Sequence, residues 1–154
     1  MEPIEKFLKE KNIPYKLIQL EQVAYTVDEV IAYAKGDIRP EEICKTIILK
    51  GKKTGQKAAV LLLGNERIDF SKAKKVFNEE MCVADREEVK IVSGVDAGAV
   101  CPFLLTIPLF VDEKALALEK INCGSGNHLY GLEFKTVDFS HGVSYKVISI
   151  GKSN

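Results

Sequence analysis

The segment KTIILKGKKTGQKAAVLLLG, residues 45–64, decides the fold class of this chain. Its two apolar runs are typical of buried strands, and the Gly/Lys/Thr segment between them is typical of a turn. The pattern predicts an antiparallel hairpin. Lys45 stands at the mouth of the first strand. Its ammonium either reaches water while the stem covers apolar surface, or it serves a ligand.

Helical patterns precede the hairpin. In residues 3–12, apolar side chains follow helical spacing up to a closing asparagine. In TVDEVIAYAKG, Thr26 and Glu29 have capping-box spacing, and Gly36 offers a left-handed C-terminal stop. We therefore expect a helix in each of these segments, with a strand in YKLIQL, residues 15–20, between them.

Short helices and strands alternate after the hairpin. FSKAKKVFNEE carries a serine before a helical pattern, where an N-cap is expected. DREEVKIVSG repeats this arrangement with Asp85, Glu88 and a closing Gly94, and MCVA lies between the two segments. Four strand-like segments follow: LLTIPLFVDE, KINCGSG, LYGLEF and YKVISI. Pro108 predicts that the first of them is an edge or bulged strand. We expect the last few residues to fray.

These elements predict one compact α+β domain over residues 1–154. Its sheet should be mixed and mostly antiparallel, with short helices flanking it. A barrel-like closure of the sheet is an open alternative. No internal repeat, low-complexity tract or linker composition divides the chain, so the strands and helices should share one core.

Composition and charge exclude several classes of protein. Of the 154 residues, 22 are basic and 22 are acidic, so there is no long-range field to steer the molecule onto a polyanion. No stretch reaches the ~18 apolar residues of a membrane-spanning helix, and the N-terminus lacks a signal-peptide pattern. We expect a cytoplasmic protein without membrane contact.

Cysteine and histidine are sparse and scattered. The four cysteines lack the CxxC spacing of zinc and redox sites, and two histidines are too few for a three-histidine metal site. We therefore expect separate, reduced thiols. The sequence predicts neither a metal nor another cofactor.

Two glycine-rich segments could carry chemistry: SGVDAGAVCPF, residues 93–103, and NCGSGNHLYG, residues 122–131. Glycine lets backbone approach a ligand closely, and successive N–H groups can bind a carbonyl or phosphate oxygen. Each segment is also typical of an ordinary turn, and neither matches a dinucleotide or P-loop fingerprint. Their combination with Lys45 carries more information than either segment alone.

KTIIL, GVDAGAVCPF, FVDE and GSG follow one another in an order that resembles the YbaK and prolyl-tRNA-synthetase-associated editing domain family. The resemblance covers nearly the whole chain. The matched positions are Lys45 and Thr46 for the family's lysine and hydroxyl residue, Gly94, Gly98 and Pro102 for its glycine loop, Gly124, Ser125 and Gly126 for its later small-residue loop, and Glu133 for an acidic position.

This resemblance implies a trans-acting aminoacyl-tRNA deacylase. Such an enzyme hydrolyses the ester that joins a wrong amino acid to the terminal adenosine of a tRNA, typically proline tRNA carrying alanine or cysteine. The attacking group is then water or a group of the substrate, so no enzyme nucleophile is required. Fixed backbone N–H donors would stabilise the tetrahedral oxyanion.

The resemblance also implies the residues of the site. Lys45 would position the substrate as the catalytic residue. The implied partner is the acceptor end of a mischarged tRNA, while a synthetase partner and the oligomeric state stay open. The predicted substrate-binding residues are Tyr25, Thr46, Gly94, Gly98, Ala99, Cys101, Pro102, Gly124, Ser125, Gly126 and Glu133.

Two other functions remain open at this stage. The first is a non-catalytic module that binds tRNA or a nucleotide beside a synthetase. The second is a thiol hydrolase of small esters with Cys101 as nucleophile, although buried packing is the ordinary interpretation of Cys101 and of Cys44. The lysines of KGKKTGQK could contact a tRNA backbone or form a solvated turn. Alanine, cysteine and serine all remain candidates for the amino acid removed.

Overall fold

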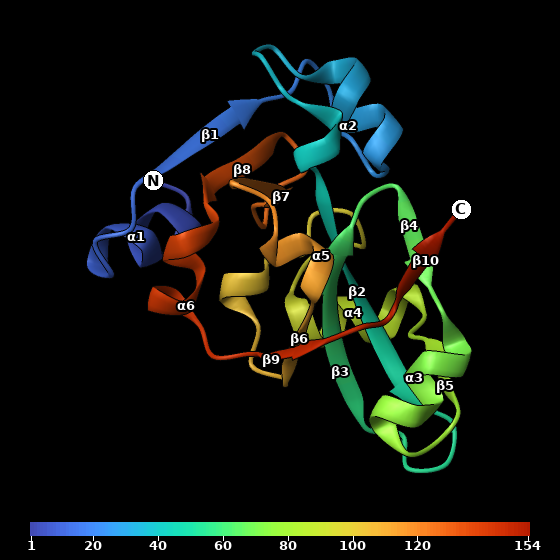
Figure 1. Ribbon diagram of the computed structural model, residues 1–154. Coiled ribbons are helices and arrows are strands. Elements are labelled where there is room, and N and C mark those ends of the chain that lie inside the picture. The colour runs from blue at the N-terminus through green and yellow to red at the C-terminus, as the bar shows by residue number, and fades with distance from the viewer.

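The computed structural model describes residues 1–154 and contains a five-stranded sheet in the order β5-β2-β3-β6-β9 (Figure 1). β2 and β3 form the predicted antiparallel hairpin, whereas β6 runs parallel to β3 and β9 runs parallel to β6. The bounds are β2 (Cys44–Gly51), β3 (Lys57–Leu63), β5 (Met81–Val83), β6 (Leu109–Asp112) and β9 (Lys146–Ile148).

A three-stranded antiparallel sheet lies beside the first, in the order β1-β8-β7, and a two-stranded ribbon pairs β4 with β10 (Figure 1). These strands are β1 (Tyr15–Gln19), β4 (Glu66–Ile68), β7 (Lys120–Gly124), β8 (Tyr130–Lys135) and β10 (Gly151–Ser153). The expected mixed, mostly antiparallel α+β domain is confirmed. The sheets stay separate, so the barrel-like alternative is wrong.

Six helices flank the sheets, and none has the length and apolar character needed to cross a membrane. They are α1 (Pro3–Glu10), α2 (Val27–Tyr33), α3 (Phe70–Phe77), α4 (Arg86–Ser93), α5 (Glu113–Leu116) and α6 (Phe139–Gly142). Three short 3₁₀ turns, Pro40–Glu42, Pro102–Leu104 and Thr136–Asp138, complete the chain. The four longer helices occupy the four segments in which the sequence predicts helix.

Most of the expected helix caps are present. Asp85 and Glu88 form a reciprocal capping box, and Gly94 ends α4 with φ of 78°. The Thr26 hydroxyl accepts the Glu29 N–H at 3.1 Å, so Thr26 caps α2 as expected. The prediction for Gly36 is wrong, because α2 already ends at Tyr33 where the backbone turns extended.

Three further expectations are wrong. The N-cap of α3 is Asp69 and not the serine that follows it. Pro108 directly precedes β6, which is an interior strand and not an edge strand, and the Pro108 carbonyl accepts the Ala59 N–H at 2.9 Å. The C-terminal residues do not fray, because Gly151–Ser153 pairs with β4 and the buried Asp112 carboxylate accepts the Gly151 N–H at 2.7 Å.

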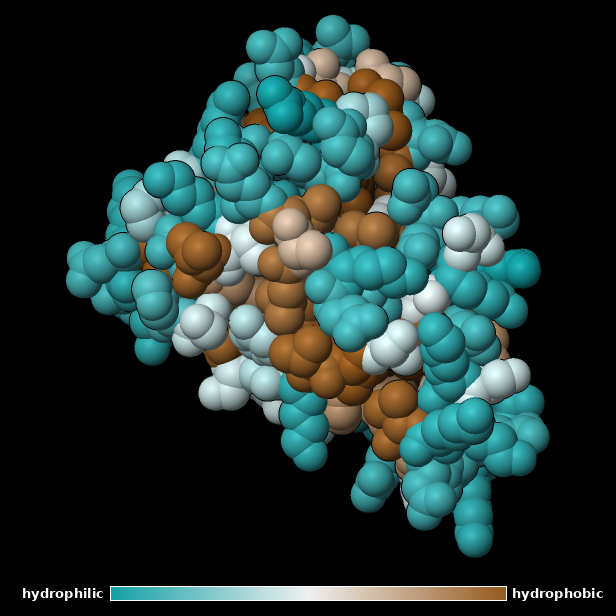
Figure 2. Space-filling model, in the orientation of Figure 1, coloured by the Kyte–Doolittle hydropathy of each residue, from teal (hydrophilic) through white to brown (hydrophobic).

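The hydrophobic residues form two clusters. The larger contains 20 buried residues, among them Cys44, Cys101 and Cys123, and the smaller contains seven, among them Leu62 and Ile150. Core packing of Cys44 is therefore confirmed. Helix α2 differs from this pattern, since none of its residues is buried. Figure 2 shows apolar side chains reaching the surface over α2 and again over α5 and β9.

Candidate functional site

The outer edge of β2 is only partly covered. β5 pairs with Leu49–Gly51 alone, and β7 meets the chain before β2 at a single bridge, from Ile43 to Asn122. The Ile43 carbonyl accepts a hydrogen bond from the Gly64 N–H, on the β3 side. The Ile48 carbonyl accepts one from the Ala84 N–H, on the opposite side. Because these directions alternate along a strand, the N–H and C=O of Thr46 face the uncovered edge.

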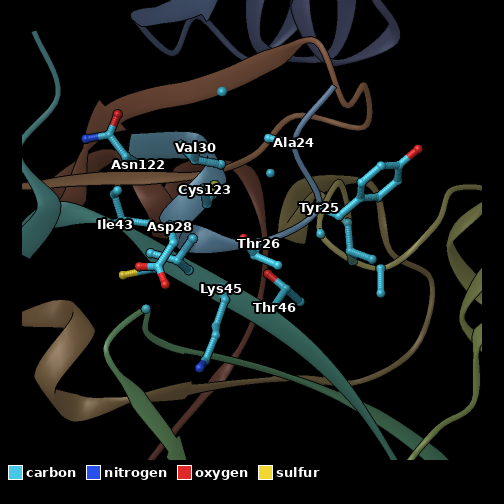
Figure 3. Close-up of a pocket in the computed structure, with 18 of the residues that line it drawn as sticks. Ala24, Tyr25, Thr26, Asp28, Val30, Ile43, Lys45, Thr46, Asn122 and Cys123 are labelled. Carbon is cyan, nitrogen blue, oxygen red and sulfur yellow. The ribbon is translucent and has the colours of Figure 1, made fainter. Parts of the chain in front are cut away.

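A cavity of about 770 Å³ borders this edge of β2. Its walls include the segment from Leu20 to Ile31, which contains the first part of α2, together with the start of β2, the glycine loop 97–100 and the end of β7. Figure 3 shows Lys45 and Thr46 on β2, with the Tyr25 ring turned outward at one end and Asn122 at the other. Chain segments that are far apart in the sequence therefore meet around one hollow.

Lys45 is a half-buried cation with no ion-pair partner on the cavity wall. Burial lowers the pKa of its ammonium, and the charge of Glu66 only partly offsets this effect. Glu66 is itself bound to Lys114, whose Nζ lies 2.7 Å from its carboxylate. The Lys45 ammonium is therefore available to an anionic or strongly polar ligand.

The glycine loop supplies free backbone donors. The N–H groups of Gly98 and Val100 have no hydrogen-bond acceptor within the protein, and both residues line the cavity. Gly98 has φ of 99°, a conformation that favours glycine. A Cβ at Gly124 would stand 2.4 Å from the Val100 carbonyl oxygen, so the end of β7 lies directly against this loop.

The structure divides the twelve residues that the sequence selects. Five of them line the cavity: Tyr25, Lys45, Thr46, Gly98 and Gly124. The other seven do not line it: Gly94, Ala99, Cys101, Pro102, Ser125, Gly126 and Glu133. Direct contact with a ligand in this cavity is therefore not supported for the second group.

Most residues of this second group stabilise the segments that form the cavity walls. Gly94 ends α4, and the Gly126 N–H donates to the Ala99 carbonyl at 2.8 Å, which ties the two glycine loops together. The buried Ser125 hydroxyl donates to the Tyr130 carbonyl at 2.6 Å. Pro102 is buried at the start of a 3₁₀ turn. Glu133 lies in β8 directly opposite Asn122 of β7.

Cys101 lies in the main core with 3% of its surface exposed. Burial raises the pKa of its thiol to about 12, which backbone hydrogen bonds offset only in part. The thiol therefore stays protonated at neutral pH. Because the thiolate is the reactive form, the structure gives no support to a Cys101 nucleophile.

His128 and Asn122 are among the cavity residues that the sequence reasoning did not select. The Nδ1 atom of His128 lies 3.1 Å from the Ala24 carbonyl oxygen, and its ring centroid lies 4.7 Å from that of Tyr25. Its Nε2 is buried without a hydrogen-bond partner, 3.9 Å from an Asp96 carboxylate oxygen. Asn122 is 3% exposed, and neither amide atom has a partner. For Asn122 the available signal was a polar residue between two apolar ones in a strand segment.

Residues 21–140 match the family model described as the aminoacyl-tRNA editing domain. The chain belongs to this family. It is 30% identical over 102 residues to proline–tRNA ligases of Legionella pneumophila strains Lens and Corby, which covers 65% of this chain and 17% of each ligase. The editing domain thus spans less than a fifth of the length of these relatives.

Solved structures share the fold over almost the full chain. A hypothetical protein superposes with a TM-score of 0.87 at 25% identity, covering 98% of this chain and 100% of the other. A candidate trans-editing enzyme for prolyl-tRNA synthetase superposes with a TM-score of 0.79 at 19% identity, covering 99% of both chains. The family assignment agrees with the resemblance carried by the lysine strand and the two glycine loops.

Proposed function

We propose that this editing domain is an aminoacyl-tRNA deacylase that hydrolyses the ester of a small amino acid wrongly attached to proline tRNA. One observation carries the proposal: Lys45, whose ammonium is unpaired, lines the same cavity as Gly98 and Val100, whose N–H groups are free. A cation suits the phosphate or ester of an aminoacylated 3′ end. Backbone donors suit the oxyanion of ester hydrolysis.

The reaction needs no nucleophile from the chain. Water adds to the ester carbonyl, its proton passes to the departing ribose oxygen, and the products are a free amino acid and a tRNA with a free 3′ hydroxyl. The Gly98 and Val100 N–H groups stabilise the tetrahedral oxyanion, an effect worth roughly 3 kcal/mol for each donor. Lys45 holds the 3′ end in a reactive pose.

The ligase relatives support proline tRNA as the carrier, because their name specifies that tRNA. Alanine and cysteine are the acyl groups that the YbaK resemblance implies, and serine is the third candidate. We infer that residues 1–154 act as one editing domain, because Ile4 and Leu8 of α1 belong to one core and Ile150 belongs to the other, although all three lie outside the matched residues 21–140. The site of action is the cytoplasm, and a synthetase is the candidate partner.

The decisive experiment is a deacylation assay on proline tRNA charged with alanine, cysteine or serine. Lys45→Ala should lower kcat/KM by on the order of a hundredfold, as expected for a group that orients the substrate. Lys146→Ala is the matched control, because Lys146 is exposed on β9 and lies outside the cavity. Full activity of the Lys45 variant would refute the assigned role.

The same deacylation assay distinguishes the proposed enzyme from the alternative, a non-catalytic tRNA-binding module. Such a module would bind the charged tRNA without releasing the amino acid, even with excess protein and long incubation. The unpaired Lys45 is compatible with binding alone, but the paired free N–H groups of Gly98 and Val100 favour hydrolysis. Cys101→Ala should leave the rate within about twofold, since the buried thiol is protonated.

A further inference from the structure

Asn122 is a polar side chain sealed into the wall of an otherwise largely apolar compartment. It is 3% exposed, and neither its amide nitrogen nor its amide oxygen has a hydrogen-bond partner. Buried polar groups are almost always paired, because leaving one unpaired destabilises the fold. An amide that the protein itself leaves unpaired therefore points to a ligand.

The strand pattern fixes the direction of this amide. Ile121 and Cys123, the neighbours of Asn122 in β7, both belong to the main core. Because side chains alternate along a strand, Asn122 projects to the opposite face. Val27 and Val30 of α2 line the same cavity as Asn122. None of the α2 residues is buried, so this helix lies over the compartment without being anchored in a core.

The amide also lies close to the proposed reaction centre. Asn122 is bridged to Ile43, and Lys45 follows Ile43 by two residues on the same side of the chain. All three residues line the cavity, with Asn122 and Lys45 visible on either side of Ile43 in Figure 3. Asn122 and Lys45 therefore border the same compartment. With the ester at Lys45, the side chain of the attached amino acid would lie toward Asn122.

The chemistry of an amide selects among the small side chains. An asparagine amide offers donors on nitrogen and an acceptor on oxygen, so its complement must both accept and donate. A methyl group does neither, and a thiol does both only weakly. An ammonium only donates, and its charge would be buried among apolar side chains at a high cost. A hydroxyl group satisfies both atoms of the amide.

We propose that Asn122 is a specificity-determining residue that makes this domain select a hydroxyl-bearing acyl group, with seryl ester favoured over alanyl ester. The proposal rests on the deacylase function proposed above and names the class of side chain removed. A site built to hydrogen-bond a substrate hydroxyl rejects the analogue without it, because the buried partners then stay unpaired.

The test compares hydrolysis of seryl- and alanyl-proline tRNA by the wild type and by Asn122→Leu, which removes the amide at similar volume. The wild type should favour the seryl ester by at least about tenfold in kcat/KM. Asn122→Leu should lose about tenfold or more on the seryl ester and stay within about threefold on the alanyl ester. Asn122→Ala should shift the preference in the same direction.

Equal losses on both esters would overturn the proposal, because the amide would then bind a part common to both substrates. The melting temperature supplies a second readout. Replacing an unpaired buried amide by an apolar group of similar shape is neutral or stabilising, so Asn122→Leu should melt no earlier than the wild type. A clear drop would mean that the folded protein already satisfies the amide, which also overturns the proposal.

A binding measurement distinguishes the role of Asn122 from the proposed deacylase function. Seryl and alanyl amides of 3′-amino-adenosine, which cannot be hydrolysed as esters, serve as probes in titration calorimetry. If the wild type hydrolyses neither ester but binds the seryl probe more tightly, the deacylase function fails and the role of Asn122 stands. If it hydrolyses both esters without preference, the function stands and the role of Asn122 fails.

Discussion

Gly98 lies so close to the backbone of Tyr25 that a Cβ at Gly98 would stand 2.5 Å from the Tyr25 carbonyl oxygen. Its φ of 99° is a conformation that residues with a side chain rarely adopt. The contact presses the glycine loop against the segment that leads into α2. This relationship holds the free N–H groups of the loop at the cavity.

Gly98→Ala should therefore damage both stability and catalysis. The clash and the strained φ should cost about 2 kcal/mol of unfolding free energy, and displacement of the oxyanion donors should lower kcat/KM by at least about tenfold. The control is Gly55→Ala, which has φ of 74° and open space around its Cβ position. Thermal melts and deacylation rates decide the matter. Wild-type kinetics in the Gly98 variant would contradict this account.

Lys45 should be a residue that lowers stability in exchange for function. Burial lowers the pKa of its ammonium from an ordinary value near 10.5, so the folded state disfavours the charged form. Lys45→Met should consequently melt at the same temperature as the wild type or higher at pH 7, while deacylation falls. A lower melting temperature would show instead that the ammonium stabilises the fold.

The sign of the pH effect follows from the same shift. The folded chain releases the Lys45 proton at a lower pH than the unfolded chain, so the unfolded state binds more protons between the two pKa values. Stability should rise with pH in that alkaline window, just below 10.5, and Lys45→Met should remove the rise. Chemical denaturation at a series of pH values measures it.

Glu88 should contribute stability that is lost in acid. A hydrogen bond from Lys50, and then the backbone N–H of Asp85, hold the pKa of its carboxyl at about 2, with Nζ of Lys50 2.7 Å away. A lowered pKa stabilises the fold above the ordinary value of 4.5, and the effect disappears as pH falls towards 2. Glu88→Gln should therefore be less stable than the wild type at pH 7, and the two stabilities should converge near pH 2. Glu87→Gln, which removes no ion pair, is the control.

Asp112 should anchor the C-terminal strand. Its buried carboxylate accepts the N–H groups of Ile150 at 2.9 Å and Gly151 at 2.7 Å. Asp112→Asn turns one acceptor into a donor, which should cost about 2 kcal/mol and accelerate amide exchange in Gly151–Ser153. Asp37→Asn is the exposed control. Unchanged exchange in the C-terminal strand would argue against this anchor.

Local sequence patterns predicted the parts of the fold that depend on neighbours along the chain. The hairpin follows from two apolar runs around a turn, and the cap at Asp85 with its stop at Gly94 follows from residues within one helix. Capping and alternation act over a few residues, so the sequence carries them directly. Gly36 and Pro108 show where this reasoning ends, because tertiary contacts ended α2 early and put β6 inside the sheet.

The sequence by itself determined the fold class, the family resemblance and the selection of Lys45 as a candidate, since these depend on residue types and their order. Only the tertiary structure decided which of the selected residues share a cavity. It brought Gly98 and the overlooked Asn122 to the same hollow as Lys45, and it turned Cys101 and Ser125 into packing residues. The reason is physical: loop direction and side-chain exposure depend on packing between segments distant in the chain, which no local pattern encodes.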